Sequence, residues 1–295
     1  MGWNSLIASA SSRLAEQGVA SPRADAREIA EVVGGGRIAS LPAPDSEQRA
    51  RFESMVRRRA ERVPLQHVTG RMYFRFLELA SRPGCFIVRP ETELVAEEAI
   101  AELRALLADS GDAPSARPQT ARPVAVDLCT GSGAIALALA TEVPGARVIG
   151  VELSDEAFSL ARENNARYGD VVELVRGDAR TALGELEGKV DVVVANPPYV
   201  PPTVQVSPEV DADPDLALWG GGTDGTEFPL ALIARAVDLL APGGILVMEH
   251  AENQAEKLVA AALAAGFADA HTGYDFTGRP RWLRADRPGR KGRGD

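Results

Sequence analysis

The 295-residue sequence has only two cysteines, Cys85 and Cys129, and three histidines that stand far apart. Two cysteines cannot build a disulfide framework or a four-thiolate zinc site. No window approaches the roughly 18 uncharged apolar residues of a membrane span. The first residues also lack the basic and apolar segments of a secretory signal. We therefore expect no metal, no membrane association and a cytoplasmic protein.

Basic charge is scarce as well. The net charge is −10 and the isoelectric point is near 5.0, whereas a nucleic-acid-binding domain is more often basic. No Lys or Arg occurs between Lys189 and Arg235, although seven Asp and Glu residues do. Such a stretch is typical of a solvated acidic loop, or of a negative rim for a cationic ligand or basic partner. The overall charge predicts no direct nucleic-acid binding.

The remaining composition is that of a globular chain, with 45% hydrophobic and 25% charged residues, and the length favours two unequal domains. Apolar residues recur at helical spacing before Gly18, and Ser21 with Pro22 can start a second helix. Asp45 can cap a third. Residues 1–63 are therefore predicted to form a small helical domain, which we interpret as the substrate-recognition domain.

The next segments carry extended and irregular signals. Residues 64–88 contain the partly alternating Tyr73–Leu79 and a Pro83-Gly84 turn, which predict a β-hairpin linker. A helix is expected over Thr92–Leu107. Residues 109–123 are rich in Ser, Gly, Pro, Ala and Thr and are predicted to be a mobile loop. The basic tail at 287–295 is predicted to be disordered.

Strands and helices alternate after Pro123, which predicts an α/β domain with a mostly parallel sheet covered on both faces. Apolar runs such as Val192–Ala195 are typical of strands buried on both sides. A final helix and two strands near Ala268–Tyr274 and Arg281–Ala285 complete the domain, to which we assign residues 89–286.

A glycine loop follows the first strand of this domain. Gly131 and Gly133 allow a tight turn and close approach of a ligand. Glu152 ends the second strand, where its carboxylate can accept both ribose hydroxyls of an adenine nucleoside. Asp178 follows the third strand and can read the adenine amino group. This pattern alone does not separate S-adenosylmethionine from NAD.

The most specific motif is Asn196-Pro197-Pro198-Tyr199, at the end of the fourth strand. Two prolines hold the chain extended, so the carbonyl of Pro197 is free to accept a hydrogen bond. Asn196 adds a side-chain acceptor and Tyr199 a planar face. The motif therefore suits an NH₂ group on a planar conjugated system. Because the motif holds no strong base, it favours methyl transfer from a sulfonium by positioning and charge stabilisation.

This motif, with Pro64–Gly70, Arg89–Glu93 and Asp213–Gly221, resembles the HemK family of protein glutamine-N5 methyltransferases. The resemblance covers nearly the whole chain. It implies a Rossmann-like class I S-adenosylmethionine-dependent methyltransferase domain with a mostly parallel seven-stranded sheet, preceded by the helical bundle and the hairpin. It also implies methylation of the glutamine in the Gly-Gly-Gln motif of class I peptide chain release factors, with S-adenosyl-L-homocysteine as product and a monomeric enzyme.

The resemblance also implies roles for particular residues. The cofactor would be held by Cys129, Thr130, Gly131, Ser132, Gly133, Glu152, Asp178, Ala179 and Asn196. The glutamine amide would be held by Asn196, Pro197, Pro198 and Tyr199, with Asn196, Pro197 and Tyr199 as the catalytic residues. Phe74 would wall the methyl-transfer pocket.

Three positions depart from the family pattern: Cys129 replaces a glycine, Val88 a proline, and Ala179 a bulky residue placed against adenine. Cys129 is interpreted as a packed residue, since no histidine is near in sequence to activate a thiolate.

Other functions remain as alternatives. An adenine-N6 nucleic-acid methyltransferase presents the same planar NH₂ group to the same four residues. The others are a glutamine methyltransferase acting on another translation protein, a non-catalytic binding protein and an NAD dehydrogenase.

Overall fold

The computed structural model describes residues 2–108 and 122–289, which separate into two compact units. The first contains the described residues up to Met72, together with Ser81–Pro83 and Gln205–Asp213. The second contains Tyr73–Ala80, Gly84–Val204 and the described residues from Pro214 onward. Most of the predicted loop at 109–123 and of the predicted tail at 287–295 lies outside the described residues.

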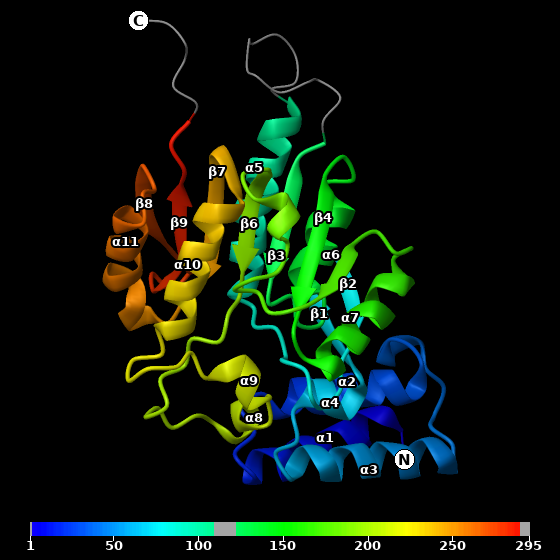
Figure 1. Ribbon diagram of the computed structural model, residues 1–295. Helices are drawn as coiled ribbons and strands as arrows, with labels where there is room; N and C mark the ends of the chain where they lie inside the picture. Colours follow the sequence, from blue (N-terminus) through cyan, green and yellow to red (C-terminus); the bar gives the residue numbers. More distant parts are fainter. Residues whose placement is uncertain (1, 109–121, 290–295) are drawn as a thin grey trace, which may run out of the picture. The chain divides into compact units, whose positions relative to one another are not determined.

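The first unit is helical (Figure 1). Its helices are α1 (Trp3–Glu16), α2 (Pro22–Gly34), α3 (Ser46–Ala60), α4 (Leu65–Thr69) and α8 (Pro208–Asp211), with a 3-10 turn at Ile38–Ser40. Pro22 occupies the first turn of α2, and Asp45 forms a capping box with Gln48 at the start of α3. Trp3 and Phe52 meet edge to face in the core. The helices predicted from periodicity and capping are therefore confirmed.

A cluster of charges is buried in this unit. Arg59 is 6% exposed and donates from Nε to Asp25 Oδ2 at 2.7 Å. Glu209, in the segment Gln205–Asp213, accepts from Arg59 at 3.1 Å and from both Nε and Nη2 of Arg62 at 2.6 Å. The hydrogen bond from Arg62 lowers the pKa of Glu209 to about 2. These bonds attach Gln205–Asp213 to the helices.

Helix α4 lies where the sequence predicted extended structure. Pro64 precedes it with an extended ψ, and Gly70 ends it after little more than one turn at a φ of +75°. One turn is too short for its apolar periodicity to stand out, so the sequence pattern missed it.

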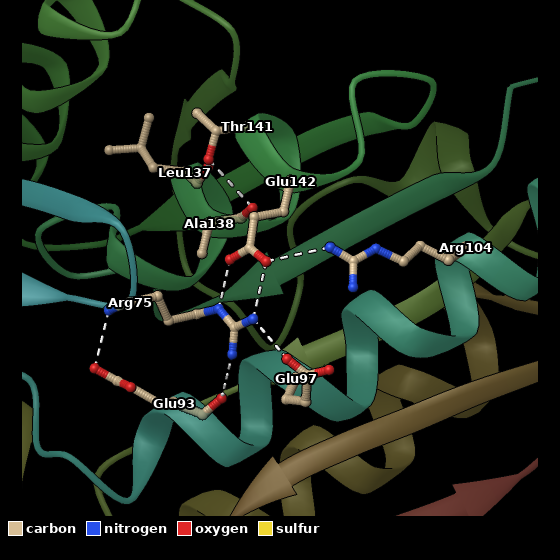
Figure 2. Close-up of polar contacts among 8 residues, drawn as sticks. All are labelled: Arg75, Glu93, Glu97, Arg104, Leu137, Ala138, Thr141 and Glu142. Atoms are coloured by element: carbon tan, nitrogen blue, oxygen red, sulfur yellow. Dashed lines mark hydrogen bonds and ion pairs between the residues drawn. The ribbon is translucent and has the colours of Figure 1, made fainter.

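The hairpin consists of β1 (Arg71–Phe74) and β2 (Leu77–Ala80). It turns at Arg75-Phe76, and the turn predicted at Pro83-Gly84 also forms, but it follows β2. Arg75 adopts a φ of +52° there, and its amide donates to Glu93 Oε1 at 2.9 Å. Its guanidinium binds Glu142 and Glu97, and Arg104 adds a bond to Glu142 (Figure 2). Charged side chains from α5 (Thr92–Ala108) and α6 (Ala134–Glu142) thus fix the turn.

A seven-stranded sheet forms the centre of the second unit, in the order β5-β4-β3-β6-β7-β9-β8 (Figure 1). Its strands are β3 (Val124–Leu128), β4 (Arg147–Glu152), β5 (Glu173–Arg176), β6 (Val190–Ala195), β7 (Leu240–Glu249), β8 (Asp269–Tyr274) and β9 (Pro280–Asp286). The first five are parallel, and β9 pairs antiparallel with both β7 and β8. Every residue of β6 is buried, as expected for a central strand.

Helices α5 (Thr92–Ala108) and α10 (Glu227–Leu239) pack on β6 and β7. Helix α6 (Ala134–Glu142) packs on β3 and β4, α7 (Asp155–Arg167) on β4 and β5, and α11 (Ala255–Ala264) on β8 and β9. The short helix α9 (Asp215–Leu218) follows β6. This arrangement leaves the carboxyl ends of β3, β4, β6 and β7 together at one edge of the sheet.

Candidate active site

A cavity of about 180 Å³ lies at this edge, entirely within the second unit. The parallel register brings the segments after β3, β4, β5 and β6 to it. Its lining includes Phe86, Thr92, Cys129, Thr130, Gly131, Ser132, Glu152, Asp178, Ala179, Asn196, Pro198, Leu216, Trp219 and Phe228. Eight of the nine predicted cofactor-binding residues, all but Gly133, therefore line this cavity, whereas only Asn196 and Pro198 of the five predicted substrate-binding residues do.

The segment Cys129–Gly133, which we call the glycine loop, depends on left-handed backbone. Gly131 has a φ of +58° and Gly133 of +86°. No heavy atom would lie within 4 Å of a Cβ on Gly131, so conformation rather than crowding calls for glycine there. Cys129 also has a positive φ, +66°. That value explains why glycine suits this position, although cysteine occupies it here.

The surroundings of the Cys129 thiol favour its protonated form. Burial raises its pKa well above the usual value, and the nearby carboxylates of Glu152 and Asp127 raise it further. A high pKa keeps the thiol protonated near neutral pH. The structure thus supports the interpretation of Cys129 as a packed residue.

Asp127 lies beneath the glycine loop and is fully buried. Its Oδ2 accepts from Thr130 Oγ1 at 2.6 Å and from the amide of Ala136 at 3.1 Å, whereas Oδ1 has no hydrogen-bond partner among the described residues. Burial raises the pKa of this carboxyl to about 7, against the opposing effect of those two bonds. Asp127 therefore joins the loop to the start of α6 through a carboxyl group that titrates near neutrality.

Glu152 is tied to the loop through backbone groups. Its Oε2 accepts from the amide of Gly131, and its Oε1 from the amides of Leu153 and Ser154, each at 2.8 Å. A carboxylate offers about four acceptor positions, so about one remains on Oε2. A ligand diol that engages Glu152 with both hydroxyls would displace one backbone donor. The contact of Glu152 with both ribose hydroxyls stays a prediction.

Asp178 is paired with Arg180 in the same turn, at 2.6 Å between Oδ2 and Nη2. The hydrogen bond from Arg180 lowers the pKa of Asp178. The Arg180 guanidinium in turn lies 5.5 Å from the ring centroid of Phe228, which lines the cavity at the start of α10. Ala179 is small, but Phe228 supplies an aromatic surface to the same cavity.

Asn196 lies at the cavity directly after β6, with three supporting residues. Its Nδ2 donates to Thr92 Oγ1 at 3.2 Å, and Tyr199 donates from its hydroxyl to Glu249 Oε1 at 2.9 Å. Thr92 and Glu249 are 0% and 2% exposed. Burial raises the pKa of Glu249, while hydrogen bonds from the Thr92 and Tyr199 hydroxyls oppose that effect. We call Thr92, Asn196, Tyr199 and Glu249 the Asn196 cluster.

The remaining predicted site residues are placed as follows. Pro197 and Pro198 are both buried, and only Pro198 of the two lines the cavity. Tyr199 faces Glu249, and its carbonyl accepts from Gln254 Nε2 at 2.8 Å. Phe74, in β1, is 1% exposed, and it does not belong to the described lining of the cavity. Its role as a wall of the methyl-transfer pocket stays a prediction.

The site residues that were not identified from the sequence include Thr92, Glu249, Phe86 and Phe228. Thr92 lies within Arg89–Glu93, one of the segments that resemble the family. Glu249 ends a predicted strand at the ligand-binding edge, so its strand-end position was an available signal. Phe228 had no comparable signal, since it follows a long irregular segment.

The acidic stretch between Lys189 and Arg235 is largely engaged in local bonds. Within the second unit, Asp191 accepts from the amide of Val124, Asp215 from the Trp219 indole, and Asp224 pairs with Lys257. Glu209 is held by arginines in the first unit. These carboxylates stabilise local structure, while Asp211, Asp215 and Glu227 are exposed. The solvated acidic loop and the negative rim both stay predictions.

The lining fits S-adenosylmethionine. A planar adenine suits the aromatic and aliphatic surface near Phe228, and a ribose hydroxyl suits the acceptor position left on Glu152. Within residues 2–108 and 122–289, no cluster of acidic, His or Cys side chains suits a metal ion. The same described segments contain no helix long and apolar enough to cross a bilayer.

Comparison with known proteins identifies the family. Residues 5–70 match the PrmC N-terminal domain, and residues 125–207 match a methyltransferase domain. The release factor glutamine methyltransferase of Streptomyces coelicolor is 46% identical over 95% of this chain and 96% of its own length. This chain belongs to the release factor glutamine methyltransferase family. The Deinococcus radiodurans member of that family is 40% identical over 98% of this chain and 100% of its own.

A further relative of this chain bears a different name. The 4-amino-L-phenylalanine/4-methylamino-L-phenylalanine methyltransferase of Streptomyces pristinaespiralis is 44% identical over 73% of this chain and 70% of its own.

Solved structures share the fold. The hMettl16 catalytic domain in complex with the MAT2A 3′UTR hairpin 6 aligns with a TM-score of 0.51 at 14% identity, over 86% of this chain and 85% of that one. The predicted Rossmann-like methyltransferase fold is therefore confirmed, as is the family resemblance.

Proposed function

We propose that this chain transfers a methyl group from S-adenosylmethionine to the side-chain amide nitrogen, N5, of the glutamine in the Gly-Gly-Gln motif of class I release factors. The observation that carries this proposal is the Asn196 side chain at the cavity, in a chain 46% identical to a release factor glutamine methyltransferase over nearly its full length. An amide NH₂ is the acceptor that such an arrangement suits.

The cofactor supplies an electrophilic methyl group on a sulfonium when it is bound. The glycine loop, Glu152 and the pair Asp178 and Ala179 hold the nucleoside, and Phe228 adds an aromatic wall in place of a bulky residue at Ala179. Apolar side chains around the cavity exclude water, which strengthens the remaining polar contacts. Excluding water also prevents loss of the methyl group to solvent.

The acceptor amide is held by the motif after β6. The side-chain carbonyl of Asn196 and the backbone carbonyl of Pro197 each accept one hydrogen of the NH₂ group, and Tyr199 lies against its plane. These contacts direct the nitrogen lone pair at the methyl group and stabilise the positive charge that develops on nitrogen. The N–CH₃ bond would form as the S–CH₃ bond breaks, with S-adenosyl-L-homocysteine as the leaving group. No strong base would be required at that moment, because the methylated nitrogen would lose its proton to water afterwards.

A small aromatic amine is the second candidate acceptor. The relative named for 4-amino-L-phenylalanine is 44% identical to this chain, and an arylamine also carries NH₂ on a planar conjugated system. Full-length similarity to the release factor enzymes and the match to the PrmC N-terminal domain at residues 5–70 favour the protein substrate.

The proposal extends to partners and location. The enzyme acts as a cytoplasmic monomer, and the helical unit recognises the release factor. A net charge of −10 argues against nucleic acid as the acceptor.

The test is transfer of tritiated methyl from S-adenosylmethionine to a purified class I release factor. A release factor whose Gly-Gly-Gln glutamine is replaced by Asn serves as the control, and 4-amino-L-phenylalanine, DNA and RNA are offered as competing acceptors. We expect label on the intact factor alone. Label on the glutamine-substituted factor, or preference for an amine or nucleic acid, would refute the assignment.

A further inference from the structure

The Asn196 cluster contains two buried polar side chains, Thr92 and Glu249, that no proposed contact with the cofactor or acceptor requires. They come from different segments, since Thr92 is the first residue of α5 and Glu249 the last residue of β7. Strands β6 and β7 pair in parallel with Ala195 opposite Met248, so the next residues, Asn196 and Glu249, are neighbours at the sheet edge. Buried polar groups in such a place are retained for a specific arrangement.

We propose that Thr92 and Glu249 are positioning residues that fix which way the Asn196 side-chain amide faces. This inference rests on the proposed function, in which the Asn196 carbonyl accepts a hydrogen of the glutamine amide. It adds that the orientation of that carbonyl is imposed by a relay of hydrogen bonds behind it.

The direction of the relay follows from the donors each group possesses. An ionised carboxylate only accepts, so Glu249 receives the hydroxyl proton of Tyr199 at 2.9 Å, and in the proposed relay it receives that of Thr92 as well. The Thr92 hydroxyl has a single proton, and once this is given to Glu249 its oxygen can only accept from Asn196. The bond observed, from Asn196 Nδ2 to Thr92 Oγ1 at 3.2 Å, has this polarity.

An inverted Asn196 amide would be unfavourable for the same reason. A rotation of 180° would bring Asn196 Oδ1 against the Thr92 oxygen, with no proton between the two acceptors. The observed orientation directs Oδ1 away from Thr92, and Asn196 lines the cavity. The relay therefore presents an acceptor, rather than a donor, to the NH₂ group of the substrate.

Glu249 also fixes Tyr199, the second side chain of the motif. Its Oε1 accepts the Tyr199 hydroxyl, while its Oε2 has no hydrogen-bond partner in the described parts of the chain. A buried carboxylate with an unpaired oxygen costs stability. Positioning both Asn196 and Tyr199 offers a functional reason for that cost.

Two substitutions test the relay through opposite defects. Thr92→Val keeps the shape of the side chain but removes the hydroxyl. Glu249→Gln keeps the length but introduces an NH₂ donor, which can bind the Thr92 oxygen and release its proton toward Asn196 Oδ1. We expect each to lower kcat about 10- to 100-fold, as small errors of orientation do, with little change in KM for the release factor.

Three further measurements separate positioning from a structural role. Thr92→Ser retains the hydroxyl and should restore kcat to within about threefold of wild type, since the contact is remade. Thr141→Val is the matched control, because the Thr141 hydroxyl donates to the carbonyls of Leu137 and Ala138 within α6 (Figure 2). Calorimetry should find unchanged S-adenosylmethionine affinity in Thr92→Val. Wild-type kcat in Thr92→Val or Glu249→Gln, or a loss confined to KM or cofactor affinity, would overturn the proposal.

A readout independent of activity keeps this inference apart from the proposed function. In ¹⁵N-labelled protein the Asn196 side-chain NH₂ signals are identified by their loss in Asn196→Ala. We expect Thr92→Val to move them and to speed their hydrogen exchange, and Thr92→Ser to return them. Signals identical in wild type and Thr92→Val would overturn the relay. Failure of the wild-type enzyme to label a release factor would instead refute the proposed function, leaving the NMR result to decide the relay.

Discussion

The glycine loop and the Asn196 cluster follow the neighbouring strands β3 and β6 and hold their polar side chains differently. Around the loop, Glu152 is held by three backbone amides, and each of these belongs to a residue close to a strand end. In the Asn196 cluster, side chains hold one another, and they come from α5, the segment after β6 and the end of β7. The glycine loop therefore depends on backbone conformation, and the Asn196 cluster depends on the direction of individual hydrogen bonds.

This difference predicts where single substitutions act. Changes around the loop should appear in cofactor affinity and stability, while changes in the Asn196 cluster should appear in turnover. Substitutions at four residues test the contrast.

The largest effect is expected for Asn196→Ala. It deletes one acceptor for the glutamine amide, and loss of one such contact typically costs about 10²- to 10³-fold in kcat. Tritiated methyl transfer to the release factor measures it, with calorimetry to confirm that cofactor affinity changes less. Asn196→Asp is the sharper variant, because it keeps an acceptor toward the substrate but cannot donate to Thr92. Full activity of Asn196→Ala would remove the basis for the assigned function.

Glu152→Gln should weaken S-adenosylmethionine binding by about tenfold or more, since charge-assisted bonds contribute roughly 1.5–3 kcal/mol each before compensation. Gln is preferable to Ala because an amide oxygen still accepts from some of the backbone amides that hold the loop. Glu173→Gln, at the start of β5, is the control. The contrast between the glycine loop and the Asn196 cluster fails if Glu152→Gln lowers kcat at saturating cofactor and leaves the dissociation constant of S-adenosylmethionine unchanged.

Asp127 should make the stability of the enzyme depend on pH. Its pKa is about 7 in the folded chain against an ordinary value of 3.8, so the native state binds the proton more tightly. Its contribution is complete below about pH 4 and is lost as pH rises toward 7, by up to about 1.4 kcal/mol per pH unit. Urea unfolding of wild type and Asp127→Asn across this range measures it. Equal pH slopes in the two proteins would contradict the raised pKa.

The smallest effect is expected at Cys129. Cys129→Gly relieves a left-handed backbone, worth about 1–2 kcal/mol, but adds about 0.5–1 kcal/mol of chain entropy, so stability should change by about 1 kcal/mol or less. Cys129→Val should destabilise by about 2 kcal/mol, because a branched side chain fits that conformation poorly. Thermal unfolding compares them. A Val variant as stable as wild type would show that a branched side chain fits the left-handed backbone at this position.

The same contrast explains what could be predicted from the sequence. Gly131, Gly133, Glu152 and Asn196 follow strands at fixed spacing, so local pattern was enough to find them. Thr92 and Glu249 have meaning only once α5, β6 and β7 are packed together, and no spacing between them encodes that contact. The hairpin turn at Arg75 was missed for the same reason, because its positive φ is stabilised by acids on distant helices.

The bonds from Arg59 and Arg62 to Glu209 bear on how this protein can be divided. The chain enters the helical unit a second time, at Gln205–Asp213, between the Asn196 motif and α9. A cut after residue 63 would leave Glu209 without both arginines, so such a truncation alters more than substrate recognition. A chimera that exchanges recognition units between related enzymes must carry two separate stretches of sequence, and single-crossover recombination would yield mismatched halves.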